Sequence, residues 1–151
     1  MTENTVLLVE DNPSDVFIVQ RIFQKLKLQS SLQVASNGDE AIAYLSGTGK
    51  YSDRERFPLP AVVLLDLKLP RRSGLEVLEW LKAQPVLGRL PVVVLTSSKQ
   101  ASDINQAYDR GANSYLVKTM NPRDNEEIAK VVHHYWIHCN QKPDIEQAIV
   151  S

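Results

Sequence analysis

Residues 61–74 read AVVLLDLKLPRRSG. The stretch begins with an unbroken apolar run, Ala61–Leu65, which Asp66 follows. The remaining residues, with a proline, two arginines and a glycine, have the composition of a loop. A short run of Ala, Val and Leu is typical of a strand that is buried on both faces of a parallel sheet. Two further runs of this kind, Val6–Val9 and Val92–Leu95, are also followed by polar residues. The three runs therefore predict the central strands of a parallel sheet.

Segments with helical periodicity alternate with these runs. The first opens at Pro13, which is favoured in a first helical turn, with Asn12 suited to cap the helix and Asp15 in the first turn. Further helices are expected near residues 39–45, 74–81, 101–110 and 122–138, and two weaker strands near residues 34–35 and 115–117. Five successive strand–helix units predict an α/β fold, in which helices cover both faces of a parallel sheet and the crossovers are right-handed.

Two segments lie outside this plan. Residues 46–60, SGTGKYSDRERFPLP, are rich in Gly, Pro and charge, and we expect a long surface loop there. Residues 140–151 are expected to form a short tail after a single domain at residues 1–139. The apolar positions of this tail are spaced like one docked helical turn: Ile145, Ala148 and Ile149.

The composition argues against several classes of protein. The chain is 43% hydrophobic and 23% charged, which supports a packed core rather than disorder. The net charge of -1 is not that of a general binder of nucleic acid or membrane surfaces. The one cysteine, Cys139, excludes an internal disulfide framework, and no apolar run approaches the roughly 20 residues of a membrane span. Because Glu10 and Asp11 come too early for a signal peptide, we expect a cytoplasmic protein.

Polar side chains follow four of the expected strands. Glu10 and Asp11 come after the first strand, and Asp66 comes after the third. Thr96 ends the fourth strand and Lys118 follows the fifth. Ligands of open parallel sheets bind beyond the carboxyl ends of the strands, so we expect these side chains to converge on one rim.

The predicted carboxylate cluster needs a counter-charge. Two unit charges 4 Å apart repel by on the order of 4 kcal/mol at an effective dielectric near 20. A hard divalent cation with oxygen ligands removes this repulsion, so Glu10, Asp11 and Asp66 are candidate Mg²⁺ ligands. A carboxylate between Mg²⁺ and Lys118 is suited to accept a phosphoryl group as an acyl phosphate, because this transfer depends mainly on positioning and charge neutralisation.

Four motifs occur in an order that resembles the receiver domain of two-component response regulators: VLLVEDN at 6–12, VVLLDLKLPRRSG at 62–74, VVVLTSS at 92–98 and SYLVK at 114–118. More narrowly, the chain is similar to the small single-domain regulators of cyanobacterial phytochrome histidine kinases. The resemblance implies a flavodoxin-like (βα)5 fold, doubly wound, with a five-stranded parallel sheet in the order 2-1-3-4-5. It also implies a phosphorelay in which a sensor histidine kinase, expected to be of the phytochrome type, is the phosphoryl donor.

The resemblance assigns roles to individual residues. Asp66 is implied as the phosphoacceptor, and Thr96 and Lys118 as the side chains that contact the phosphoryl group. Thr96 is also implied as one half of a conformational switch, with Tyr115 as the other half. The implied Mg²⁺ ligands are Glu10, Asp11, Asp66 and the backbone carbonyl of Lys68.

The expected output is a change in protein–protein contacts, because no second domain follows in this sequence. Many relatives dimerise through the fourth and fifth helices, and we expect a homodimer here. Tyr135 and Trp136 are either core residues or dimer contacts, with Trp136 favoured for the interface. Neighbours on an α-helix lie about 100° apart, so the two rings are expected to point in different directions.

The sequence departs from the common receiver pattern in two places. Thr119 stands where most receivers have proline, which leaves open the path of the next loop and the reach of Lys118. Lys68 lies two residues after Asp66, at the mouth of the expected site. We predict that its ammonium group shields the acyl phosphate and alters its lifetime.

Other functions stay open at this point. A phosphatase of the aspartyl-phosphate type normally needs a second Asp where this chain has Lys68, so we do not expect an enzyme. A flavodoxin-like electron carrier lacks support, because no phosphate-cradling loop follows the first strand. A receiver-fold adaptor that works without phosphorylation is a third possibility, against which the complete set of strand-end residues argues. His134 and His138 have zinc-binding spacing, but no third ligand is evident.

Overall fold

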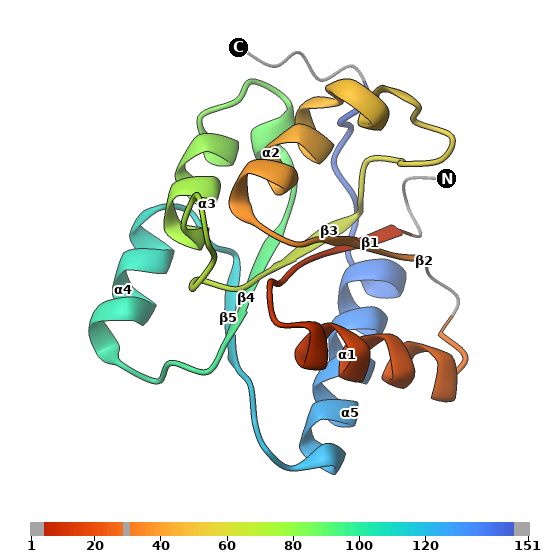
Figure 1. Cartoon of the computed structure of the whole chain (residues 1–151), viewed down its shortest axis with the longest axis vertical. Coiled ribbons are helices and arrows are strands. Elements are labelled where there is room, and N and C mark those ends of the chain that lie inside the picture. The colour runs from red at the N-terminus through yellow and green to blue at the C-terminus, as the bar shows by residue number, and fades with distance from the viewer. Residues whose placement is uncertain (1–4, 29–30, 147–151) are drawn as a thin grey trace.

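The computed structural model describes residues 5–28 and 31–146, and its five strands form one parallel sheet (Figure 1). The strand order is β2-β1-β3-β4-β5, so the expected doubly wound flavodoxin-like fold and its strand order are confirmed. The strands are β1 (Thr5–Val9), β2 (Ser31–Ala35), β3 (Val62–Leu65), β4 (Val92–Thr96) and β5 (Ser114–Val117).

In the described residues, five α-helices connect or follow the strands. Their bounds agree with the expected ranges to within one or two residues, apart from the end of the last helix. They are α1 (Pro13–Lys25), α2 (Gly38–Ser46), α3 (Gly74–Lys82), α4 (Ala101–Asp109) and α5 (Pro122–Val132). Asn12 caps α1 as expected, and its side chain accepts hydrogen bonds from the backbone N–H groups of Ser14 and Asp15. Asn121 caps α5 in the same way.

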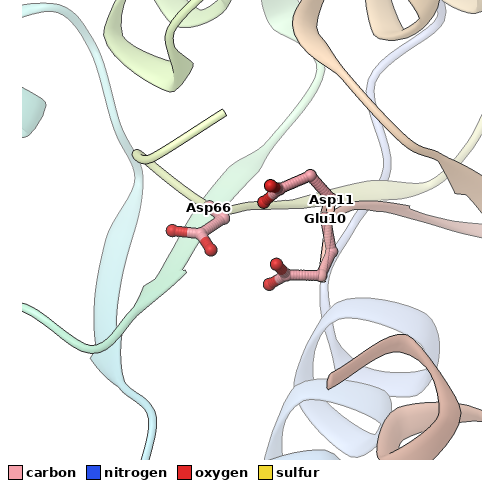
Figure 2. A group of neighbouring side chains, drawn as sticks. All are labelled: Glu10, Asp11 and Asp66. Carbon is pink, nitrogen blue, oxygen red and sulfur yellow. The ribbon is translucent and has the colours of Figure 1, made fainter. Parts of the chain in front are cut away.

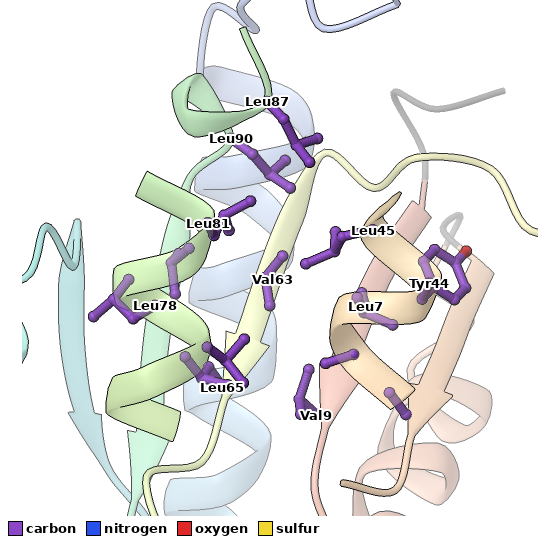
Figure 3. Close-up of a cluster of buried hydrophobic side chains, with 14 of the residues drawn as sticks. Leu7, Val9, Tyr44, Leu45, Val63, Leu65, Leu78, Leu81, Leu87 and Leu90 are labelled. Carbon is purple, nitrogen blue, oxygen red and sulfur yellow. The ribbon is translucent and has the colours of Figure 1, made fainter. Parts of the chain in front are cut away.

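The helices form two layers, with α2, α3 and α4 on one face of the sheet and α1 and α5 on the other (Figure 1). Strand side chains alternate between the faces, so each strand contributes to two cores. The core under α2 and α3 contains the sheet residues Leu7, Val9, Val63 and Leu65, which Figure 3 labels. It also contains Val92 and Val94. The core under α1 and α5 contains the sheet residues Val6, Leu8, Val62, Leu64 and Val93.

Residues 46–60 do not form the plain surface loop that their composition predicts. The 3-10 turn η2 (Gly49–Ser52) places Tyr51 in the core, where the residue is 5% exposed. The guanidinium of Arg54 donates a hydrogen bond of 2.7 Å to the carbonyl of Tyr44 near the end of α2. Apolar burial and helix-end carbonyls, which lack helical partners, therefore organise this segment.

The chain after α5 differs from a simple helix and tail. The final segment η4 (His133–Cys139) is π-helical and continues α5. The Tyr135 and Trp136 rings contact each other edge to face with centroids 4.7 Å apart. A π-helix turns less per residue than an α-helix, which brings neighbouring side chains closer. Trp136 packs against the core while Tyr135 is 50% exposed, so Tyr135 is the aromatic residue that faces solvent.

The tail packs against the domain through Ile145, which is 6% exposed and belongs to the core under α2 and α3. The guanidinium of Arg89, in the short turn η3 (Leu87–Arg89), donates to the carbonyl of Asp144 at 3.1 Å. Docking of Ile145 agrees with its apolar spacing, although residues 140–146 form no helix. Ala148 and Ile149 lie outside the described residues. Within the described ranges, no helix is long and apolar enough to cross a membrane.

Candidate functional site

The backbone ladder of the sheet continues past the strand ends and positions the residues that follow. The Asp66 amide donates to the Val9 carbonyl at 3.1 Å, and the Lys118 amide donates to the Thr96 carbonyl at 2.8 Å. The Glu10 amide likewise donates to the carbonyl of Ala35, the last residue of β2, at 3.0 Å. These residues therefore lie at one edge of the sheet, beside the point between β1 and β3 where the crossovers diverge.

Three carboxylates converge at this edge (Figure 2). One oxygen from each of Glu10, Asp11 and Asp66 lies within 4.8 Å of the other two, and the described residues contain no other such group of His, Cys, Asp or Glu. His134 and His138 accordingly do not form a metal site of this kind. An all-oxygen donor set suits a hard divalent cation.

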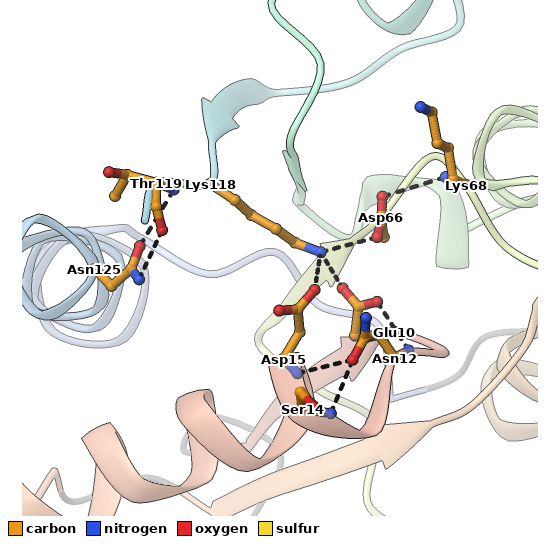
Figure 4. A network of polar contacts seen from close by, with 9 residues as sticks. All are labelled: Glu10, Asn12, Ser14, Asp15, Asp66, Lys68, Lys118, Thr119 and Asn125. Atoms are coloured by element: carbon orange, nitrogen blue, oxygen red, sulfur yellow. Dashed lines mark hydrogen bonds and ion pairs between the residues drawn. The ribbon is translucent and has the colours of Figure 1, made fainter. Parts of the chain in front are cut away.

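The ammonium of Lys118 reaches the same carboxylates (Figure 4). Its Nζ contacts the Glu10 carboxylate, lies 2.9 Å from Oδ2 of Asp66 and lies 3.0 Å from Oδ2 of Asp15. From sequence, Asp15 is expected only in the first turn of a helix. Asp15 lies about one helical turn after Asp11, on a helix that starts at the site. This spacing is the signal that could have identified Asp15 as a fourth carboxylate of the site.

Burial and charge act differently on the two buried carboxyl groups. Burial raises the pKa of Glu10 to about 7, and hydrogen bonds from Lys118 and the Asn12 amide offset this only in part. Burial also acts on Asp66, but hydrogen bonding and the charge of Lys118 outweigh it and lower the Asp66 pKa below its usual value. Burial opposes the charge of Lys118, yet its bonds to the carboxylates raise its pKa. Near neutral pH Glu10 is therefore partly protonated, whereas Asp66 stays an anion able to act as a nucleophile.

The hydroxyl of Thr96, the last residue of β4, is buried without a partner among the described residues. The residue is 1% exposed, and among the described residues Oγ1 has no hydrogen-bond partner. Leaving a buried hydroxyl unsatisfied costs about 1–3 kcal/mol. A ligand oxygen at this edge of the sheet is one way to satisfy it.

Tyr115 joins β5 to the loop that follows β4. Its hydroxyl donates to the carbonyl of Ser98 at 3.0 Å, and the Ser98 hydroxyl is hydrogen-bonded to the Asp103 carboxylate in α4. The Tyr115 side chain thus contacts the loop rather than the acidic cluster. Hydrogen bonds thus tie the loop after β4 to both Tyr115 and α4.

The loop after Lys118 keeps the lysine in reach of the site despite Thr119. All peptide bonds of the described residues are trans. The side chain of Asn125 accepts from the Thr119 amide at 3.4 Å and donates to the Thr119 carbonyl at 3.0 Å. These two bonds hold the loop, and Lys118 contacts Asp66 without a proline at position 119.

The loop after β3 is packed against its neighbours. The Lys68 amide donates to Oδ1 of Asp66 at 3.2 Å, while the Lys68 ammonium is directed away from that carboxylate (Figure 4). A Cβ atom on Gly74 would lie 2.2 Å from the Asp66 carbonyl oxygen, so α3 can start here only with glycine. Arg71 and Arg72 pair with Asp39 at 3.2 and 3.1 Å, which anchors the loop to α2.

This geometry defines a class of protein: a doubly wound α/β domain with an acidic site, suited to a divalent cation, at its topological switch point. Residues 6–131 match the model of the response regulator receiver domain, and the chain belongs to this family.

Relatives in sequence place the chain among small regulators. It is 36% identical over 132 residues to the response regulator Rcp1 of Synechocystis sp., covering 87% of this chain and 88% of Rcp1. It is also 36% identical over 141 residues to the probable methanogenesis regulatory protein FilR2 of Methanothrix harundinacea, covering 91% of this chain and 86% of FilR2.

Solved structures agree with this placement. The phosphorylated cyanobacterial phytochrome response regulator RcpA matches with a TM-score of 0.85 at 34% identity, covering 93% of this chain and 99% of RcpA. The Mn²⁺-bound form of Rcp1 matches with a TM-score of 0.82 at 35% identity, over 93% of this chain and 99% of that one. The resemblance to single-domain phytochrome response regulators is thereby confirmed.

Proposed function

We propose that Asp66 accepts a phosphoryl group from a sensor histidine kinase and that Mg²⁺ assists the transfer. One observation carries this proposal: the Asp66 carboxylate faces the acidic cluster of Glu10 and Asp11 and also lies 2.9 Å from Nζ of Lys118. An anionic oxygen between a cation site and a fixed ammonium has the surroundings that phosphoryl transfer requires.

The residues present fit a divalent cation, because the donors are hard oxygens and the carboxylates outnumber the ammonium groups that contact them. Glu10, Asp11, Asp66 and the backbone carbonyl of Lys68 would hold it. Mg²⁺, when bound, would neutralise negative charge on the phosphoryl oxygens.

The chain's own side chains then perform the transfer. An Asp66 oxygen attacks the phosphorus of a phosphohistidine, the P–N bond breaks, and the leaving imidazole keeps the electron pair of that bond. Lys118 neutralises one phosphoryl oxygen. The unpartnered Thr96 hydroxyl donates to another, which satisfies a buried polar group.

The switch follows from the contacts of the β4–α4 loop. When Thr96 moves toward the phosphoryl group, the loop that carries the Ser98 carbonyl moves with it, and the Tyr115 hydrogen bond must adjust. We infer that the face formed by α4, β5 and α5 changes shape and that the signal is a change in protein contacts, not catalysis of a substrate reaction.

The partners are inferred from the phytochrome response regulators to which the chain is similar. We propose a phytochrome-type histidine kinase as the phosphoryl donor, in the cytoplasm, and a homodimer formed through the α4–α5 face. Tyr135, which is exposed, and Trp136, which supports it edge to face, are the proposed aromatic contacts of that dimer. Phosphorylation and dimerisation would strengthen each other by equal free energies.

The proposal is tested by incubating the protein with acetyl phosphate and Mg²⁺ and measuring its mass. Wild type should gain one phosphoryl group, and Asp66→Asn should gain none. Asp109→Asn, at an exposed aspartate at the end of α4, is the control and should behave as wild type. Full labelling of Asp66→Asn would show that another residue is the acceptor, and absence of labelling in wild type would favour an adaptor. Molar mass with and without beryllofluoride tests the dimer.

A further inference from the structure

The hydrogen-bonding capacity of Lys118 is fully used. An ammonium group has three N–H donors. Three carboxylates contact Nζ of Lys118: Glu10, Asp66 at 2.9 Å and Asp15 at 3.0 Å (Figure 4). A phosphoryl oxygen can therefore pair with Lys118 only after one of these bonds is released.

The three carboxylates differ in what release would cost. The Glu10 side chain is 2% exposed and the Asp66 side chain is 10% exposed, so neither can regain full hydration. The Asp15 side chain is 38% exposed, and water can replace the ammonium there at small cost. Asp15 is thus the partner that Lys118 can exchange most readily.

Asp15 is held in place by the start of α1. Its backbone amide and that of Ser14 donate to the side chain of Asn12, at 3.3 and 2.8 Å. The carboxylate consequently projects from a capped first turn and not from a loose loop. Its contact with Lys118 joins α1 to the residue after β5, 103 positions further along the chain.

We propose that Asp15 is a positioning residue, which holds Lys118 in the unphosphorylated protein and competes with the phosphoryl group on Asp66 for the same ammonium hydrogen. This inference rests on the proposed phosphorylation of Asp66. Loss of the Asp15 charge frees one donor of Lys118 in advance, so the phosphorylated arrangement becomes easier to reach. Asp15 would in this way set how strongly the phosphoryl group is held.

The chain contains a matched control for this residue. Helix α1 begins with the sequence NPSD, which ends at Asp15, and helix α5 begins with NPRD, which ends at Asp124. Both helices are capped by the asparagine of the motif. In the described part of the chain, no hydrogen bond or ion pair involves the Asp124 carboxylate. Replacement of Asp124 removes the same charge from the same helical position without affecting Lys118.

The first test measures the affinity for beryllofluoride, a phosphoryl mimic, at saturating Mg²⁺ in the full chain. An exposed ion pair is worth about 0.2–1 kcal/mol, so Asp15→Asn should bind about 1.4- to 5-fold more tightly than wild type. Asp124→Asn should match wild type. Unchanged or weaker binding by Asp15→Asn overturns the inference while the proposed function stands. Failure of wild type to bind beryllofluoride overturns the proposed function and the inference with it.

The second test needs neither metal nor phosphoryl mimic. The NMR signal of the Lys118 side-chain ammonium should shift in Asp15→Asn and stay in place in Asp124→Asn, because only the first variant loses a bond to Nζ. A merely structural role of Asp15 in α1 would not produce this difference. An unchanged Lys118 signal in Asp15→Asn shows that the contact is absent in solution and overturns the inference.

Discussion

Nζ of Lys118 lies 2.9 Å from Oδ2 of Asp66, although 52 positions separate the two residues in the sequence. The contact exists because β3 and β5 flank β4 and all three strands end at one edge of the sheet. It places a single ammonium among Glu10, Asp15 and Asp66. An excess of negative charge at a partly buried site makes its stability and ligand binding sensitive to that ammonium, to pH and to cations.

Lys118→Met should destabilise the metal-free protein. Loss of the Lys118 ammonium leaves the carboxylates of Glu10 and Asp66 buried without the cation that contacts both. We expect the free energy of unfolding, measured by urea in EDTA, to fall by about 2–4 kcal/mol, less than for a fully buried pair because Lys118 is 21% exposed. Added Mg²⁺ should restore part of the loss. Lys130→Met, at an exposed ion pair, is the control, and an equally small effect of both substitutions would contradict the argument.

Metal-free stability should fall as pH rises toward the slightly alkaline range. The pKa of Glu10 is raised by burial from an ordinary value of 4.5 to about 7, so the folded protein binds this proton more tightly than the unfolded chain. The contribution of Glu10 to stability is then fully present below pH 4.5 and lost as pH rises through about 7. Between pH 4.5 and pH values just above 7, the unfolding temperature in EDTA should therefore decrease more steeply with pH in wild type than in Glu10→Gln. Equal slopes would show that the titration of Glu10 does not control this pH dependence.

Tyr115→Phe should loosen the loop after β4. The substitution removes only the hydroxyl that donates to the Ser98 carbonyl. We expect a loss of about 0.5–1.5 kcal/mol in the free energy of unfolding and faster hydrogen exchange of the loop amides. Tyr108→Phe, on an exposed tyrosine of α4, should change neither quantity. Identical exchange in wild type and Tyr115→Phe would exclude Tyr115 from the control of this loop.

Asn125→Ala should impair the site from a distance. Both hydrogen bonds that hold the Thr119 backbone come from this side chain, and Lys118 is the preceding residue. We expect about 1–2 kcal/mol less stability and slower labelling by acetyl phosphate, because Lys118 is positioned less well. Asn105→Ala, on the exposed side of α4, is the matched control. Normal labelling of Asn125→Ala would mean that strand β5 alone positions the lysine.

Lys68→Ala tests the prediction that this lysine influences the acyl phosphate. The Lys68 amide bonds to the Asp66 carboxylate, while the ammonium is exposed and directed away from it (Figure 4). Shielding therefore requires the side chain to turn toward the phosphoryl group. The autodephosphorylation rate should change in Lys68→Ala, and equal rates in the variant and wild type would reject the prediction.

Much of the fold is determined locally and could be predicted. Runs such as Ala61–Leu65 form strands because they are short and consist of apolar residues, which suit burial on both faces of the sheet. Helix α1 begins at Pro13 because Asn12 caps it. The convergence of Glu10, Asp66 and Lys118 also followed from sequence, since the carboxyl ends of parallel strands meet at one edge.

Other features depended on distances that no local pattern encodes. Asp15 reaches Lys118, and Asn125 holds Thr119, only because α1 and α5 flank the same end of the sheet. The burial of Tyr51 within a polar segment was missed for the same reason.

The amino-acid sequence by itself determined which residues follow the strands and which chemistry they carry, because strand ends, helix caps and apolar periods are properties of neighbouring residues. The tertiary structure decided which carboxyl group has a raised pKa, which carboxylates contact the lysine and which aromatic ring faces solvent. These outcomes depend on how closely side chains from distant segments approach one another, because hydrogen bonds form only when donor and acceptor lie within about 3 Å.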